Sequence, residues 1–585
     1  MTINATLEGL LATGSIHFGW LDYTVFALML VVSVVVGTWF GVCGKKDNIA
    51  AVDYLMGGKS MNIFPVGVSL AASHISGITL MGAPADLYMY GIHYMLVFLA
   101  AISMGVMINY IYLPVFYCLQ LTSTYEYLEM RFNASARRMA SFLFTLSLIF
   151  FLPICMYVPS LAFSQVSGVS LHLISPVVCF VCIFYTMMGG LKAVVWTDFL
   201  QAFVMVGSLI AVTILGTINV GGLGSIWEKN LESGRLDVSF NPTPFTRNTF
   251  WTVTVGASFG WVSGTAVNQG TMQKFLSLPT IGNARRALIL FCVGVILLKL
   301  LSCFSGFIMY AAYYDCDPVK TQAIKRYDQL LPHFVMDTAQ DIPGLPGLFI
   351  AGVFSAALSS MSSALNSLAG TIFEDFVSPC LSGKMSDEKV NMIMKAIVAV
   401  IGALCVALIF VVERLGSVLE LGYSMGGITS GALLGLFSLG ILFPWANVKG
   451  ALAGSISSMA LLMWIVFGTQ HNAALGRLKH PLMPMSVSGC GFNVTDTPTT
   501  PLPDVEHNND DVFWLYRVSY MYYTLIGTCT VFIVGLAVSF ATGPRRPEDL
   551  DSRLFAPFVK RWVEKRQQNI AMPTEKELLN MERTS

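Results

Sequence analysis

The chain has 585 residues, of which 55% are hydrophobic and only 12% are charged. Soluble domains carry about 25% charged residues, so the composition excludes a soluble globular protein and indicates a polytopic membrane protein. The formal net charge is zero, and nothing in it points to a nucleic-acid partner.

Apolar segments long enough to cross a bilayer, about 20 residues each, recur along the whole chain. The N-terminal sequence, MTINATLEGL, lacks a basic n-region, so we expect the first segment to serve as an uncleaved insertion signal. Candidate spans lie near residues 20–43, 63–83, 92–119, 139–165, 170–188, 197–217, 250–268, 287–314, 348–377, 393–412, 417–441, 450–468 and 515–541. The sequence therefore predicts an all-α polytopic membrane protein with thirteen transmembrane helices in residues 20–541.

Basic residues between the spans predict the orientation. If residues 1–19 are extracellular, most Lys and Arg residues of the short loops lie on the cytoplasmic side, as the positive-inside rule requires. The tail, residues 542–585, is then cytoplasmic, and we expect a multi-pass protein of the plasma membrane. The N-glycosylation sequons at Asn4 and Asn493 lie on the extracellular side in this orientation.

Span two, near residues 63–83, is a poor continuous helix. His74 lies near its middle, where a histidine either bonds to a neighbouring helix or contacts a substrate or proton. Breaks in a membrane helix free backbone carbonyls, which are unfavourable in lipid unless they line a site. Helix-breaking residues interrupt the span and its continuation at Pro65, Gly67, Gly77, Gly82 and Pro84.

Span seven, near residues 250–268, is interrupted by Gly256, Gly260 and Gly264. It is the fifth span after span two, so residues of about 63–217 and 250–441 are interpreted as two inverted repeats. Broken helices at matching positions of two repeats indicate the binding site of a secondary transporter. The alternative is that these glycines only allow close helix packing.

Two charged residues lie in or beside apolar spans. Asp198 begins span six at the inner face, either as a carboxylate near a helix N-terminus or as part of a cation path. Lys299 lies within span eight, where an ammonium faces a cavity or partner, or reaches the interface along a tilted helix. At this depth Lys299 also offers counter-charge to an anionic substrate.

Residues 348–375 combine an apolar span with a row of serines. Ser355, Ser359, Ser363 and Ser367 recur every fourth residue and therefore share one helical face. Their hydroxyls are hard ligands that suit a small hard cation such as Na⁺. The alternative is that they only allow close packing of membrane helices.

The remaining patterns exclude other functions. The cysteines show no metal-ligand spacing, and the sequence alone does not show whether Cys316 and Cys490, both in expected extracellular loops, form a disulfide. The sequence contains no nucleotide-binding loop and no catalytic motif such as HExxH or GxSxG. We therefore expect a transporter driven by an ion gradient rather than an enzyme.

Several stretches, taken together and in order, resemble the sodium/solute symporter family. The DCDP loop, the Val-Asn-Gln stretch and the FEDF ending of span nine are similar to the branch of monocarboxylate, multivitamin and iodide symporters. The stretches are TSTYEYLEMRF (122–132), YTMMGGLKAVVWTDFLQ (185–201), VNQGTMQKFL (267–276), DCDP (315–318) and the serine-rich span.

The resemblance implies a LeuT-type core, which is a 5+5 inverted repeat, with one extra leading helix. It also implies a Na⁺ site between the broken span two and span nine, and it links Asp198 to cation coupling. By position, the Na⁺ site uses carbonyls of Ala72, Ile75 and Ala356 and hydroxyls of Ser359 and Ser360. The other serines of span nine are expected only to pack against neighbouring helices.

Some positions depart from the family pattern. The sugar carriers have Asn at the position of His74, and some have His where this chain has Thr79, which argues against a sugar. Lys274 replaces the usual Arg and is expected on a cytosolic loop. Lys299 matches a lysine of the sugar carriers that is not typical of the monocarboxylate, multivitamin and iodide branch. The resemblance to that branch therefore does not extend to every position.

The sequence therefore predicts a Na⁺-coupled symporter that works by alternating access on a small organic anion, such as a monocarboxylate or a carboxylate vitamin. A sugar or inositol symporter is the alternative within transport, and a non-transporting Na⁺ and ligand sensor or a Na⁺ leak channel are the others. The expected substrate site is lined by His74, Ser76, Thr79, Phe151, Trp261, Lys299 and Tyr423. Core packing would explain each aromatic ring taken alone.

Overall fold

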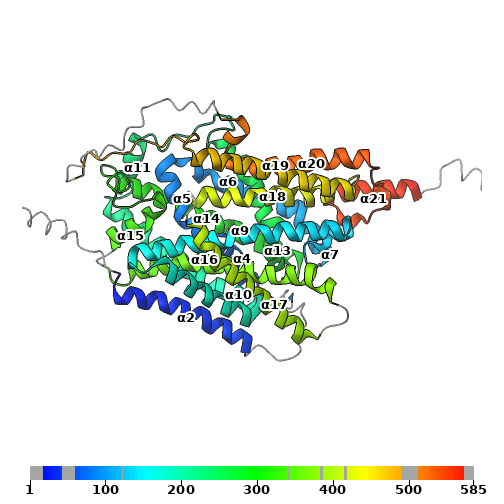
Figure 1. Ribbon diagram of the computed structural model, residues 1–585, viewed down its shortest axis with the longest axis horizontal. Coiled ribbons are helices and arrows are strands. Elements are labelled where there is room, and N and C mark those ends of the chain that lie inside the picture. The colour runs from blue at the N-terminus through cyan, green and yellow to red at the C-terminus, as the bar shows by residue number, and fades with distance from the viewer. Residues whose placement is uncertain are drawn as a thin grey trace, which may run out of the picture.

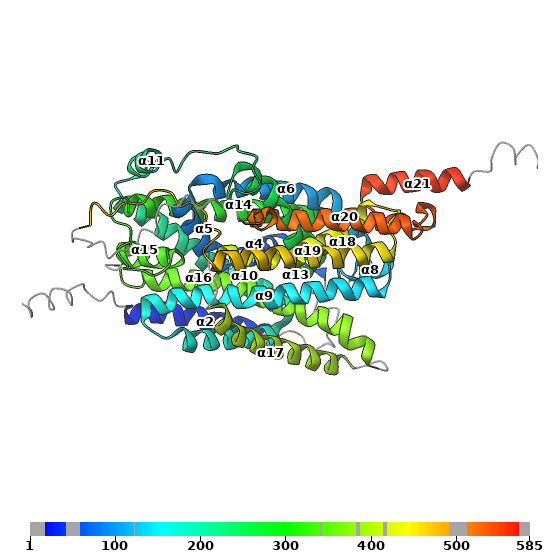
Figure 2. The ribbon, with the colours of Figure 1, turned by 45° about the horizontal axis from the view of Figure 1, so that its top comes forward.

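The computed structural model describes residues 18–42, 59–121, 123–339, 342–381, 386–413, 418–490 and 512–571. Within these ranges all regular secondary structure is helical, as the sequence predicts. Most helices run roughly along the long axis of the molecule (Figure 1). The short helices α11 (Leu223–Glu232) and α15 (Leu330–Ala339) lie at one end, whereas α21 (Pro557–Ala571) projects from the other end (Figure 2).

The other helices follow the apolar segments of the sequence. In the first half they are α2 (Trp20–Val42), α4 (Ile63–His74), α5 (Gly77–Tyr90), α6 (Val97–Met107), α7 (Leu113–Leu119), α8 (Glu126–Arg131), α9 (Ala134–Ser167) and α10 (Leu171–Asn219). In the second half they are α12 (Ala257–Ala266), α13 (Gln269–Leu276), α14 (Ile281–Ala312), α16 (Leu345–Ile372), α17 (Asp387–Val412), α18 (Val418–Leu442), α19 (Val448–Ala474) and α20 (Tyr523–Ala541).

Ten helices of the described ranges are long and apolar enough to cross a membrane, or eleven if the bent pair α4 and α5 counts as one span. The predicted number of thirteen is therefore not confirmed. The predicted spans 170–188 and 197–217 correspond to the two helical segments of α10, which meet at a kink at Gly190 and count as one helix in that number. The predicted span 250–268 is divided between a π-helical turn, Thr252–Gly256, and the short helix α12.

Helix α10 has 49 residues and bends at Gly190, where φ is 58° and ψ is −157°. A straight helix of that length would reach about 74 Å at 1.5 Å per residue, more than twice the hydrocarbon thickness of about 30 Å. Glycine adopts this left-handed backbone conformation without a steric penalty. The non-helical backbone at Gly190 therefore separates α10 into the two apolar segments that the sequence distinguishes.

The predicted break in span two lies between His74 and Gly77. Ile75 and Ser76 have extended backbone conformations, and the axes of α4 and α5 differ by 56°. Pro65 lies in the first turns of α4, where its missing N–H needs no helical partner, and Pro84 lies inside α5. The break therefore occurs at the centre of the pair and not at either proline.

A second interruption follows α12. Helix α12 ends at Ala266, and α13 begins after Asn268, whose side chain accepts a hydrogen bond from the Thr271 amide. This N-cap starts a new helix after the extended backbone of Asn268. Both segments that the sequence singles out as broken are thus divided into two helices.

The loops at the C-terminal end of α5 form a cover that is held by a disulfide. Cys316 and Cys490 are bonded, with their Cα atoms 5.1 Å apart. Beside them, the Asp317 amide donates to the Ser486 carbonyl at 3.0 Å. The Tyr88 hydroxyl of α5 donates to the Asp317 carboxylate at 2.7 Å. The pairing that the sequence left undecided therefore joins two distant loops over the end of α5.

At the opposite end, a buried arginine closes the C-terminus of α18. The Arg131 guanidinium, at the end of α8, donates to four backbone carbonyls between 2.9 and 3.3 Å, those of Gly440, Phe443, Pro444 and Ala446. The last carbonyls of a helix lack intrahelical partners, and a cation there also interacts favourably with the helix dipole. Arg131 therefore fixes α8 against α18 without a carboxylate partner in the described ranges.

Candidate substrate and cation site

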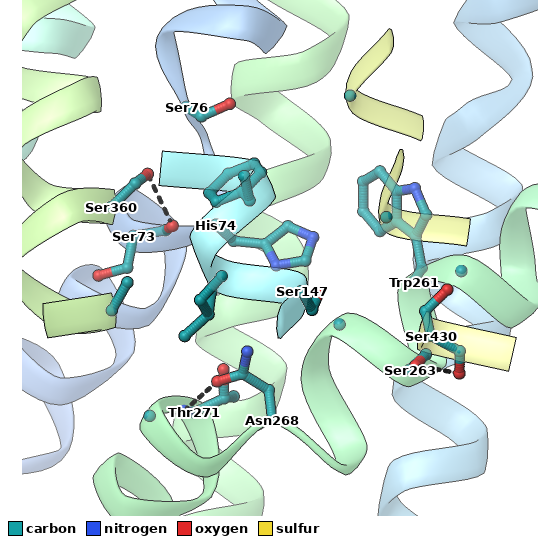
Figure 3. A pocket seen from close by; sticks show the side chains of 18 of the residues that line it. Ser73, His74, Ser76, Ser147, Trp261, Ser263, Asn268, Thr271, Ser360 and Ser430 are labelled. Carbon is teal, nitrogen blue, oxygen red and sulfur yellow. Dashed lines mark hydrogen bonds between the residues drawn. The ribbon is translucent and has the colours of Figure 1, made fainter. Parts of the chain in front are cut away.

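A cavity of about 310 Å³ lies at the break between α4 and α5 (Figure 3). Its wall is formed by α4, α5, α9, α12, α13, α14, α16, α18 and α20. Every residue predicted to contact substrate contributes to this wall, namely His74, Ser76, Thr79, Phe151, Trp261, Lys299 and Tyr423. Helices that are distant in sequence therefore bring together the polar and aromatic groups that the sequence selects.

Lys299 is the cation of the cavity wall that lacks a carboxylate partner. Its side chain does not reach the membrane interface, because the residue is only 4% exposed. The ammonium donates to the Thr79 hydroxyl at 3.3 Å and to the Tyr94 hydroxyl at 3.4 Å, and it lies 5.0 Å from the centroid of the Trp261 ring. No Asp or Glu of the described ranges lies within 4.0 Å of it.

Aromatic side chains surround this ammonium. The His74 and Trp261 ring centroids are 5.0 Å apart, and His74 also packs edge-on against Phe291 at 5.5 Å. The Tyr423 hydroxyl lies 3.1 Å from that of Tyr94. Trp261 and Tyr423 therefore have both core contacts and a position in the cavity wall, so the two sequence interpretations of these rings are compatible.

The five residues expected to bind Na⁺ lie where α16 crosses the break. The Ser360 hydroxyl donates to the Ser73 carbonyl of α4 and to the Ala356 carbonyl of its own helix, both at 3.0 Å. The Ser359 hydroxyl lies 3.2 Å from that of Ser73. Ala72, Ile75 and Ala356 are buried beside them, and Ile75 has the extended backbone of the break. The residue that joins the two helices is thus Ser73, which the sequence analysis did not select.

Asp198 is fully buried and lies within hydrogen-bond distance of three serine hydroxyls, two from α4 and one from α16. Its Oδ2 atom accepts from Ser69 at 2.8 Å, from Ser73 at 2.9 Å and from Ser363 at 3.2 Å. It lies inside α10, two turns beyond the bend at Gly190. The interpretation of Asp198 as a carboxylate at a helix N-terminus is therefore wrong, and its position beside the candidate cation site fits the other interpretation.

Lys274 is not on a loop exposed to the cytosol. It belongs to α13, is 1% exposed, and forms an ion pair with Asp198 at 2.9 Å. Its ammonium also donates to the hydroxyls of Ser73 at 2.7 Å and Ser363 at 2.9 Å. The sequence contains a signal for part of this cluster, because Ser69 and Ser73 share one face of α4 at a spacing of four residues. Nothing local indicates that Lys274 reaches them.

The serine row of α16 divides into two groups. Ser359, Ser360 and Ser363 contact residues of α4 and α10. The Ser367 hydroxyl donates back to carbonyls of its own helix, and the Ser355 hydroxyl has no hydrogen-bond partner among the described residues. The expectation that the serines other than Ser359 and Ser360 only pack agrees with the contacts of Ser355 and Ser367 and is wrong for Ser363, which bonds to Asp198.

Beyond the residues that line the cavity, ion pairs join α5 to α18. Arg247, in the loop before α12, donates to Asp86 of α5 at 3.1 Å and to Glu420 of α18 at 2.7 Å. Burial opposes its charge, yet Tyr520 and the two facing carboxylates raise the pKa of Arg247 well above its usual value. The ion pairs therefore join α5 to α18, on the side of the break away from α13.

Residues 54–458 match the sequence profile of the Sodium:solute symporter family. The chain is 37% identical over 538 residues to sodium-coupled monocarboxylate transporter 2 of Mus musculus, across 92% of this chain and 86% of that protein. It is also 37% identical over 548 residues to sodium-coupled monocarboxylate transporter 1 of Homo sapiens, across 91% and 88%.

The structure is similar to that of a Na⁺-coupled sialic acid symporter in a substrate-bound outward-open state. The TM-score is 0.74 and the sequence identity 26%, across 90% of this chain and 99% of that one. This similarity confirms the expected LeuT-type fold, and these relatives are transporters rather than enzymes. The chain is therefore a multi-pass membrane protein that belongs to the sodium:solute symporter family, with Na⁺ as its coupling ion.

Proposed function

We propose that the solute carried by this Na⁺-coupled symporter is a small organic anion, such as a monocarboxylate or a carboxylate vitamin. The observation that carries the proposal is Lys299, an ammonium in the cavity wall with only hydroxyl and ring partners. A buried charge without a counter-charge is unfavourable. A substrate carboxylate beside Lys299 removes that penalty, whereas a neutral solute leaves it in place.

The size and lining of the cavity agree with such a solute. About 310 Å³ is at the lower end of the range for small-molecule sites. Trp261, Phe151 and Tyr423 offer apolar surface for the carbon skeleton, and the ammonium and hydroxyls near Thr79 offer donors for the carboxylate. The proposed substrate residues are those predicted from the sequence, with His74 and Ser76 completing the wall.

We further propose that Na⁺ binds to carbonyls of Ala72, Ile75 and Ala356 and to the hydroxyls of Ser359 and Ser360. The support is the extended backbone at Ile75, which removes carbonyls near the break from helical hydrogen bonding, and the Ser360 bridge to α4. Because a ligand shifts a conformation only by its differential affinity, Na⁺ must favour one arrangement of α4 and α16. Asp198 is proposed to couple that arrangement to cation movement.

A sugar or inositol solute is the second candidate. It is favoured by hydroxyl and amide groups of the cavity wall that the sequence analysis did not select, namely Ser147, Ser263, Asn268, Thr271, Thr429 and Ser430. A polyhydroxylated solute needs many such partners. These groups do not explain the buried ammonium of Lys299, which is the reason for preferring an anion.

The proposed location is the plasma membrane, with an extracellular N-terminus and a cytoplasmic tail. The support is the distribution of basic residues in the short loops and the disulfide between two loops assigned to the outside, because disulfides persist in oxidising environments. Asn4 and Asn493, the proposed glycosylation sites, lie outside the described residues.

The test is current and tracer uptake in oocytes that express the chain. Lactate, nicotinate, biotin, pantothenate, iodide, glucose and inositol are applied in Na⁺ and then in choline. We expect a Na⁺-dependent inward current and tracer accumulation with one of the organic anions. A response to sugars alone would replace the anion by a sugar. Na⁺-dependent ligand binding without accumulation would indicate a sensor, and Na⁺ current without any solute would indicate a leak channel.

A further inference from the structure

The ammonium of Lys274 is enclosed by oxygen atoms that come from three other helices. It lies 2.7 Å from the Ser73 hydroxyl of α4, 2.9 Å from the Asp198 carboxylate of α10 and 2.9 Å from the Ser363 hydroxyl of α16. Ser69 adds a fourth oxygen, 2.8 Å from the same carboxylate. We call these residues, together with Ser359, the oxygen cage. Lys274 is its only member from α13, and it is the cation of the cage.

The oxygen cage adjoins the proposed Na⁺ site through Ser73. The Ser73 hydroxyl belongs to the cage, and the Ser73 carbonyl accepts a hydrogen bond from Ser360. Ser359, a proposed Na⁺ ligand, lies 3.2 Å from the Ser73 hydroxyl. The Lys274 ammonium and a bound Na⁺ would therefore be two positive charges separated by the atoms of one residue.

The cage has more converging oxygens than a lysine–aspartate pair requires. The Ser73 hydroxyl oxygen has five polar neighbours between 2.7 and 3.2 Å: the Ser69 carbonyl, Asp198, Ser359, Ser363 and Lys274. A hydroxyl donates one hydrogen bond and accepts about two, so these contacts cannot all be hydrogen bonds at once. Oxygen atoms that converge in this way are typical of the surroundings of a hard cation.

We propose that Lys274 acts as a tethered cation that occupies the place of a second Na⁺ ion, and that Na⁺ binds in the oxygen cage when the lysine is removed. The anionic frame does not depend on α13, because Asp198 and the four serines belong to α4, α10 and α16. The tethered charge remains with the protein through the transport cycle. The chain therefore binds one Na⁺ fewer than the same frame would bind without Lys274.

The inference rests on the proposed function only in its consequence for the number of Na⁺ ions that accompany each solute. The oxygen cage itself is tested by measuring Na⁺ binding without any solute. The full-length chain is purified, and equilibrium binding of radioactive ²²Na⁺ is counted without any solute. The variants are Lys274→Gln, Lys274→Arg and the double variant Asp198→Asn with Lys274→Gln. The double variant removes both charges and keeps groups of similar size, so it is the matched control for Lys274→Gln.

We expect Lys274→Gln to bind one more Na⁺ per chain than the unchanged protein. Lys274→Arg, which keeps the charge, and the double variant, which removes the carboxylate charge, should both bind the same number as the unchanged protein. The inference is overturned if Lys274→Gln is folded and binds no additional Na⁺, or if the double variant gains the same additional ion.

The binding counts distinguish the two proposals. If the unchanged protein binds Na⁺ and Lys274→Gln gains none, the inference about the cage fails and the proposed Na⁺ site stands. If the unchanged protein binds none and Lys274→Gln binds one, the proposed Na⁺ site fails and the inference stands.

If Lys274→Gln does not fold without Na⁺, Lys274→Ala is purified in Na⁺, and its melting temperature is compared in Na⁺ and in N-methylglucamine. A larger Na⁺ stabilisation than in the unchanged protein supports the inference, and an equal one refutes it.

Discussion

The Ser360 hydroxyl donates to the backbone carbonyl of Ser73 at 3.0 Å, so α16 is joined to α4 immediately before the break. A carbonyl near the C-terminal end of a helix has lost its usual intrahelical partner. Ser360 supplies that partner from another helix. Any ligand that competes for the same oxygens therefore changes the contact between α4 and α16.

Replacement of Ser360 by Ala should raise the Na⁺ concentration for half-maximal transport roughly tenfold, because one hydroxyl ligand and one interhelical hydrogen bond are lost. Ser355→Ala is the matched control, since Ser355 lies on the same helix and its hydroxyl has no partner among the described residues. The measurement is uptake against Na⁺ concentration at equal surface expression. An unchanged Na⁺ dependence of Ser360→Ala would rule out the proposed Na⁺ site.

Replacement of Lys299 by Met should weaken the apparent affinity for the proposed anionic solute roughly tenfold to a hundredfold, the range expected for a hydrogen bond to a charged group. The physical reason is the loss of the Lys299 ammonium, the only counter-charge near Thr79 among the described residues of the cavity wall. The measurement is uptake against solute concentration. Lys229→Met is the control, because that ammonium, on α11, donates to a backbone carbonyl at 2.9 Å away from the cavity. Normal affinity in Lys299→Met would remove the argument for an anion.

Replacement of Arg247 by Gln should make the cavity more accessible from the side proposed to be extracellular, because it breaks both ion pairs between α5 and α18. Loss of Arg247 leaves the buried Asp86 carboxylate and the partly buried Glu420 carboxylate without their cation, which destabilises the contact between α5 and α18. A cysteine introduced at Tyr423 should react with an external charged thiol reagent roughly tenfold faster in this variant. Arg326→Gln, which alters a partly exposed arginine near Asp328, is the control. Equal rates would show that Arg247 does not restrict access to the cavity.

Replacement of Cys316 by Ser should destabilise the folded protein by about 2–4 kcal/mol, the typical effect of losing a disulfide. Cys490→Ser should have the same effect, and the double variant should be no less stable than either single variant, because one bond is removed in all three. Thermal unfolding of the purified protein measures this. Cys118→Ser, at an exposed free cysteine, is the control. Additive losses from the two cysteines would contradict the pairing.

Much of the site was predictable because it depends on local patterns. The spacing of Ser359 and Ser363 defines one face of a helix, and the residues around His74 and Gly77 are poor helix formers in an otherwise apolar segment. The positions of most spans follow from hydropathy in the same way. These features need no knowledge of which helices become neighbours.

The features that the sequence did not show depend on distant contacts or on single backbone angles. Lys274 follows a glycine-rich segment and has a polar neighbourhood in the sequence, so local reasoning places it on a surface. Its burial results from α13 turning inward after Asn268. The sequence also did not show how the chain passes Gly190, because a kink between two helices and a loop at that point give the same hydropathy pattern.

The disulfide between Cys316 and Cys490 also makes the central part of the chain a covalent ring. The bond spans 174 positions, and α15, α16, α17, α18 and α19 all lie between its ends. A protease that cuts one loop within this ring opens it without releasing a fragment. On a denaturing gel the cut chain should therefore migrate as one piece until a reducing agent is added, and then separate into two.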